Sequence, residues 1–154
     1  ATTGMVAALA ATTMLFAAVA SAYIVRRGIS NDWVVLSLPA PVYLSILPGL
    51  AVSVVTEIAR RKVSRQQLLF AVGLSLLFFY LMHAYAWRQI VHENSSPAAA
   101  FFFVIDGAFS LYTIGGIVAL LASLRSLRLS TVALYWHYLN ALWIILLALF
   151  YLWP

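Results

Sequence analysis

Long apolar runs separated by short clusters of charged residues form the dominant pattern along this chain. Five such runs cover residues 4–25, 41–59, 67–91, 97–124 and 129–152. At about 1.5 Å per helical residue, each run is long enough to cross a hydrocarbon core of about 30 Å. The pattern therefore predicts an all-α integral membrane bundle of five transmembrane helices, with residues 1–154 forming a single transmembrane domain.

Local signals refine the predicted ends of these spans. Arg26 and Arg27 follow the first run, and Pro41 suits the first turn of the second helix. Pro48 lies inside the second run, where its missing N–H predicts a kink.

Short connections and unequal loop charges predict the topology. Loops of a few residues make consecutive helices antiparallel neighbours, which predicts an up-and-down bundle. Six basic residues then share the side of the N-terminus: Arg60, Arg61, Lys62, Arg65, Arg125 and Arg128. Only Arg26, Arg27 and Arg88 lie on the other side within or next to the spans. The positive-inside rule therefore places the N-terminus in the cytoplasm.

Composition supports a membrane protein and excludes several other classes. Hydrophobic residues make up 65% of the chain and charged residues 8%, which is too apolar for a water-soluble fold. The net charge of +5 comes from basic residues at the ends of apolar runs, where they favour anionic lipid headgroups over nucleic acid. The chain has no cysteine, so disulfides and thiolate metal sites are excluded.

Ionisable residues inside the spans are few, and each is a candidate for a functional role. They are Glu57, His83, Asp106 and His137. Glu57 precedes Arg60 and Arg61 by three and four residues, a spacing that favours an ion pair on one helix face.

His83 and Asp106 lie at similar depths in consecutive antiparallel spans, which predicts a buried polar pair. A structural hydrogen bond is the favoured interpretation of this pair, and a proton relay is the alternative. A haem held by His83 and His137 is disfavoured, because the two histidines are expected about 12 Å apart along the bilayer normal. No nucleophile with a base, phosphate loop or metal-ligand spacing is present, so we expect neither catalytic nor metal-binding residues.

The last span carries the most specific motif in the chain. It reads Tyr135-Trp136-His137-Tyr138-Leu139-Asn140-Ala141-Leu142-Trp143. This run resembles the final helix of subunit III of haem-copper cytochrome c oxidases, which has Tyr-Trp-His-Phe-Val-Asp-x-x-Trp.

Three further segments are similar to the same family in the same order. Gly4–Arg26 resembles the family's helix in which a serine-glutamate pair precedes a Phe and an Ala-Tyr-x-x-x-Arg run ends the helix. Met82–Ala86 occupies the place of the family's Leu-Gln-x-x-Glu turn. Phe101–Phe103, with Gly107 and Gly116, resembles the family's Phe-Phe-x-x-Thr-Gly-x-His-Gly-x-His helix. The chain as a whole resembles the last five of the family's seven helices.

The resemblance implies a non-catalytic subunit in the inner (plasma) membrane of a bacterium. Its main partner would be oxidase subunit I, together with subunit II and other respiratory subunits, and haem and copper would lie in these partners. It also implies bound phospholipid, for which Arg26, Arg60 and Arg61 are the headgroup candidates. Tyr135, Trp136, His137, Trp143 and Gly107 are the motif residues expected to fix the helices.

This chain departs from the family at polar positions. Thr13, Ala86 and Asn140 stand where the family has carboxylates, and Phe109 and Tyr112 stand where it has histidines. The resemblance therefore implies a scaffold and lipid holder rather than a proton conductor. A subunit III-like component of a quinol oxidase or nitric oxide reductase is an alternative. A small transporter is a further alternative, disfavoured because only Pro48 interrupts a span and no internal repeat is visible.

Overall fold

The computed structural model describes residues 2–29, 31–33, 35, 38–61, 65–90, 97–126 and 129–153. Every regular element in these ranges is helical. The elements are α1 (Thr2–Ile29), α2 (Ala40–Leu44), α3 (Ile46–Arg61), α4 (Arg65–Phe79), the π-helix η1 (Tyr80–Tyr85), α5 (Ala86–Ile90), α6 (Pro97–Ser126) and α7 (Leu129–Leu152).

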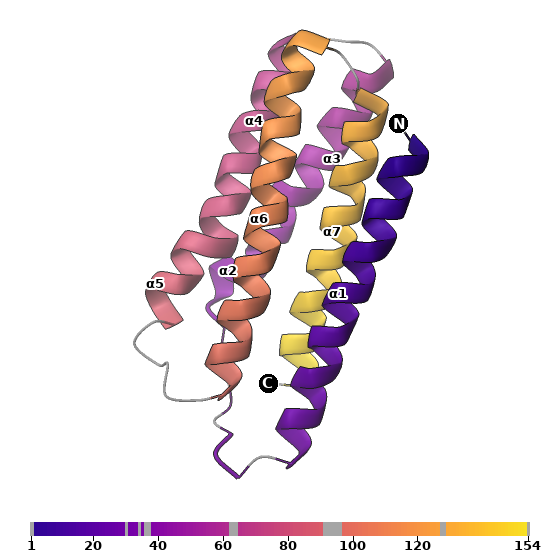
Figure 1. Ribbon diagram of the computed structural model, residues 1–154. Coiled ribbons are helices and arrows are strands. Elements are labelled where there is room, and N and C mark those ends of the chain that lie inside the picture. Colours follow the sequence, from indigo (N-terminus) through magenta and orange to yellow (C-terminus); the bar gives the residue numbers. More distant parts are fainter. Residues whose placement is uncertain are drawn as a thin grey trace.

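These elements build an up-and-down bundle (Figure 1). Within the described ranges, five helical segments are long and apolar enough to cross a membrane: α1, α2 with α3, α4 with η1 and α5, α6, and α7. The start of α1 lies at the same end of the bundle as the junctions from α3 to α4 and from α6 to α7 (Figure 1). The predicted all-α bundle of five membrane-spanning segments is confirmed.

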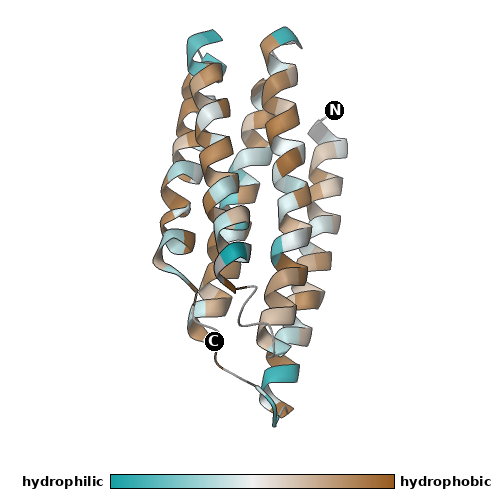
Figure 2. Ribbon diagram, turned by 90° about the vertical axis from the view of Figure 1, so that its left-hand side faces the viewer, coloured by the Kyte–Doolittle hydropathy of each residue, from teal (hydrophilic) through white to brown (hydrophobic). Residues whose placement is uncertain are grey.

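The outer surface of the bundle is apolar along most of its length. Met14, Leu111 and Ile145 are 74%, 70% and 64% exposed, although a soluble protein would bury such side chains. Figure 2 shows hydrophobic residues along the helices and hydrophilic residues mainly at their ends. Because hydrocarbon solvates apolar side chains well, this surface fits a multi-pass membrane protein.

Helix α7 lies at the centre of the packing, and α1 lies at its edge. In the most apolar 18-residue stretch of each helix, 56% of the residues are buried in α7 and 17% in α1. Around α7 lies an aromatic core of Phe78, Phe109, Trp136 and Trp143. Phe109 stacks on Trp143 with ring centroids 5.0 Å apart, and Phe78 meets both indoles edge-on at 6.2 Å.

The second membrane-spanning segment is interrupted one turn before Pro48. Since Pro48 has no N–H to donate to the carbonyl four residues earlier, regular helix stops at Leu44 and resumes at Ile46. The Ser45 hydroxyl at the break donates to the Val42 carbonyl at 2.5 Å. It also accepts a hydrogen bond from Trp143 Nε1 at 2.9 Å, which connects α7 to the interrupted part of the second segment.

Just after this break, Gly49 lets α3 and α7 approach closely. The Asn140 amide on α7 donates to the Gly49 carbonyl at 2.8 Å and also to the Ser53 hydroxyl. A Cβ atom at Gly49 would lie 2.5 Å from Asn140 Oδ1 and 3.1 Å from the Phe78 ring. Position 49 therefore has no room for a side chain.

We predict that Gly49→Ala lowers the stability of the purified protein by about 1 to 3 kcal/mol, because the added methyl group displaces the Asn140 amide. The matched control is Gly73→Ala in α4, where an added Cβ meets nothing within 4 Å. Thermal unfolding in detergent should show a lower midpoint for Gly49→Ala and an unchanged or higher midpoint for Gly73→Ala. Equal midpoints for the two variants would contradict this close packing.

Candidate functional site

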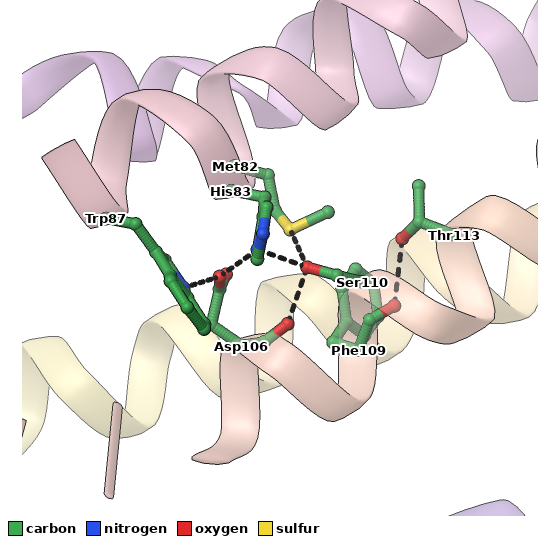
Figure 3. A network of polar contacts seen from close by, with 7 residues as sticks. All are labelled: Met82, His83, Trp87, Asp106, Phe109, Ser110 and Thr113. Atoms are coloured by element: carbon green, nitrogen blue, oxygen red, sulfur yellow. Dashed lines mark hydrogen bonds and ion pairs between the residues drawn. The ribbon is translucent and has the colours of Figure 1, made fainter. Parts of the chain in front are cut away.

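Four polar side chains from neighbouring membrane segments meet inside the bundle, and we call them the His83 cluster: His83, Trp87, Asp106 and Ser110 (Figure 3). His83 Nδ1 lies 2.9 Å from Asp106 Oδ2 and 2.6 Å from the Ser110 hydroxyl oxygen. Trp87 Nε1 donates to the same Asp106 Oδ2 at 2.6 Å. The structure thus brings together the two residues of the predicted polar pair and adds two partners.

Local helix geometry positions each member of the cluster. Asp106 and Ser110 are four residues apart on α6 and so project from one face. His83 lies in η1, where the π-helical turn rotates the following residues relative to a regular helix. Trp87 follows four residues later in α5, and its ring centroid lies 4.6 Å from that of His83. The sequence pattern gave no indication of the π-helix.

Aromatic rings hold the imidazole on two sides. Phe79 lies one turn before His83, with centroids 5.2 Å apart, and Trp87 lies one turn after it. Phe103 of α6 supports Trp87 from the other side at 5.1 Å. A Cβ atom added at Gly107 would lie 3.5 Å from the Trp87 ring, so this glycine packs against the indole.

Burial differs sharply between the two ionisable members. The Asp106 side chain is 0% exposed, whereas the His83 side chain is 24% exposed. Asp106 Oδ1 is buried without a hydrogen-bond partner among the described residues, so both donors share Oδ2. The arrangement can bind a proton on the imidazole and balance its charge with the carboxylate beneath it.

A second ionic cluster lies on a more exposed face of α3 and α7. Glu57 Oε1 accepts a hydrogen bond from the Arg60 guanidinium at 2.5 Å, and Glu57 Oε2 lies 3.0 Å from His137 Nε2. The sequence spacing indicated Arg60 as a partner of Glu57, but it gave no sign of His137. That contact depends on the register of α3 against α7, which helix periodicity alone does not define.

The remaining aromatic motif residues of the last helix fasten it to its neighbours. Tyr135 donates its hydroxyl to the Tyr112 carbonyl at 2.5 Å, and Trp136 Nε1 donates to the Gly116 carbonyl at 3.1 Å. Both acceptors belong to α6, whereas Trp143 donates to Ser45 in the second span. These residues therefore act in helix packing.

The three arginines expected at lipid headgroups lie near helix ends. Arg26 forms an ion pair with Asp32 at 3.3 Å, with both side chains exposed. Arg60 is paired with Glu57, and Arg61 is exposed at the end of α3. Lys62 and Arg128, which also entered the charge count, lie outside the described residues.

The histidines His83 and His137 belong to different clusters and share no partner. In the part of the chain that the structure describes, no three His, Cys, Asp or Glu residues are grouped closely enough to hold a metal ion.

Comparison with known proteins gives a distant relation. The chain is similar to the probable cytochrome c oxidase subunit 3 of Mycobacterium bovis, with 30% identity over 90 residues. The same protein name, identity and length of match are found for two strains of Mycobacterium tuberculosis. The match covers 49% of this chain and 44% of each relative, so the chain spans about half the length of the curated relatives that it matches. No family model matches the chain.

We predict that Asp106→Ala destabilises the protein by about 2 to 4 kcal/mol, because His83 and Trp87 then lose their shared acceptor inside the bundle. The matched control is Asp32→Ala, which removes a carboxylate from an exposed ion pair and should cost less than about 1 kcal/mol. Chemical denaturation of both variants in the same detergent measures the difference. A loss at Asp106 no larger than that at Asp32 would show that the cluster contributes little to stability.

Proposed function

We propose that the chain is a non-catalytic subunit III of a bacterial haem-copper terminal oxidase, which passes electrons from cytochrome c to oxygen. The observation that carries this proposal is the 30% identity to probable cytochrome c oxidase subunit 3 of mycobacteria. The all-α bundle of five membrane-spanning segments is consistent with it. The resemblance of the final helix, from Tyr135 to Trp143, supports the same assignment.

In this role the chain is a scaffold for subunit I, and haem and copper belong to its partners. Three polar side chains of α7 donate hydrogen bonds that hold the bundle together. Trp136, Asn140 and Trp143 donate to Gly116, Gly49 and Ser45, respectively. Such contacts define a rigid helix surface on which a large partner can pack.

Phospholipid binding is part of the proposal and is supported by apolar hollows near one end of the bundle. One hollow of about 380 Å³ is lined by Met5, Ala119, Thr131 and Tyr135, among others, from α1, α6 and α7. Another, of about 290 Å³, is lined by Val55, Ile58, Gln66, Gln67 and Phe70. An acyl chain fits such apolar walls, and Arg61 at the nearby end of α3 suits a phosphate.

The proposed orientation has the N-terminus in the cytoplasm. The end of α3, the start of α4 and the end of α6 lie at the same end of the bundle as the start of α1 (Figure 1). These helix ends contain four described arginines, namely Arg60, Arg61, Arg65 and Arg125. Three lie at the other end: Arg26, Arg27 and Arg88. The positive-inside rule favours the richer end as cytoplasmic, and Lys62 and Arg128 would add to it.

We predict that the tagged full-length chain, extracted from its native membrane in mild detergent, co-purifies with haem-containing subunits that consume oxygen with reduced cytochrome c. Absorption spectra and identification of the purified subunits measure this association. The control is an unrelated tagged membrane protein extracted in parallel. Recovery of the chain alone, without haem, would contradict the proposal. Activity with a quinol or with nitric oxide instead would assign the chain to the alternative host complexes.

A further inference from the structure

The His83 cluster suggests a contact with a neighbouring subunit, an inference that rests on the proposed function. We propose that His83 is an imidazolium with Asp106 as its counter-ion, and that its Nε2–H donates a hydrogen bond to a partner. That partner is a transmembrane helix of an adjoining oxidase subunit, which presents a carboxylate or carbonyl oxygen at the depth of His83.

The hydrogen-bond geometry places a proton on His83 Nδ1. The Ser110 hydroxyl has one proton and two acceptors besides His83, the Asp106 backbone carbonyl at 2.7 Å and the weaker acceptor Met82 Sδ at 3.7 Å, and the shorter contact assigns the proton to the carbonyl. The oxygen of Ser110 must then act as acceptor toward His83 Nδ1, 2.6 Å away. Nδ1–H therefore points into the cluster and is shared between Ser110 and Asp106 Oδ2, which leaves Nε2 as the outward nitrogen.

The same geometry indicates that Asp106 is ionised. Oδ2 accepts from Trp87 Nε1 as well as from the imidazole and so has no place for a proton of its own. A proton on Oδ1 would have no acceptor, because that oxygen has no partner among the described residues. A carboxylate that accepts two N–H donors at Oδ2 satisfies both observations.

An ionised, fully buried carboxylate requires a positive charge beside it. Among the described residues, His83 is the one ion-pair partner of Asp106, so the balancing charge resides on the imidazole. The rings of Phe79 and Trp87 lie tilted against this ring, with centroids 5.2 and 4.6 Å away, and aromatic faces attract a cation. Both nitrogens of His83 then carry a proton.

The outward Nε2–H needs an acceptor that hydrocarbon does not provide. Seven residues separate His83 from the last residue of α5, which places the ring about 10 Å below the end of the segment. Polar contacts between packed helices are how such donors are satisfied inside membranes.

The surroundings of His83 suit a helix as the occupant. Tyr80 and Trp87, one turn to either side, remain 45% and 37% exposed and offer aromatic surface for packing. The exposed edge of an imidazolium is electropositive and so complements an acceptor oxygen. In the family motifs that the chain resembles, Gln stands at the position of His83 and Thr at the position of Asp106. The charged pair is therefore a feature of this chain, and we expect its partner to present the matching acceptor.

The test uses the complex recovered through the tagged full-length chain, with partner subunits counted per chain after a detergent wash. His83→Phe keeps an aromatic ring between Phe79 and Trp87 but removes the donor, and it should reduce partner retention about tenfold. His83→Gln keeps an N–H donor and should lose less. Leu111→Phe is the control, since it changes an exposed apolar residue one turn from Asp106 without touching a donor.

Nitrogen NMR of labelled histidine in the same complex reads the protonation state, with the signal of His83 assigned by its loss in His83→Gln. Two protonated nitrogens are expected for His83. A neutral His83 ring would overturn the inference. Full partner retention by a folded His83→Phe chain would also overturn it, and this is the result expected if a lipid carbonyl is the acceptor. If the parent complex forms and both readouts fail, only this inference falls. If the parent chain recovers no partner, the proposed function falls with it.

Discussion

The bundle depends on close contact between α7 and the hydrogen-bond acceptors of its neighbours. In lipid, apolar surface gains little from leaving its surroundings, so helices associate through packing and hydrogen bonds. Here Trp136, Asn140 and Trp143 donate to Gly116, Gly49 and Ser45. Two of these acceptors are glycines, where the absence of a side chain brings the backbone within reach. The third acceptor is the side-chain hydroxyl of Ser45, which lies at the break before Pro48.

Close packing between helices accounts for two departures of this chain from the family that it resembles. Asn140 replaces an aspartate, and its amide supplies the donors that the Gly49 carbonyl and the Ser53 hydroxyl accept, which a carboxylate does not have. Phe109 and Tyr112 replace histidines, and both rings pack on Phe16 of α1, at 6.3 and 5.8 Å. Polar family positions have thus become packing positions, which is consistent with a scaffold rather than a proton pathway.

The sequence predicted the fold better than the site, for physical reasons. The number of helices follows from the length of the apolar runs, and their antiparallel arrangement follows from the short loops. Pro48 predicts the interruption of the second span. The meeting of His83 with Asp106 could be expected from matching depth. Trp87, Ser110 and the pairing of Glu57 with His137 could not, because they depend on helix rotation and register. The π-helix at Tyr80–Tyr85 also has no local signal in the sequence.

The two ionic clusters differ in what they require from outside the chain. Glu57 is shared by Arg60 and His137, and all three side chains are partly exposed near one end of the bundle, where water and headgroups can satisfy them. Asp106 is fully buried, and the side chain of its ion-pair partner His83 is 24% exposed. Because desolvation is strongest there, the charge of the inner cluster has to be balanced by protein groups. The proposed partner contact therefore lies on the α4–η1–α6 face.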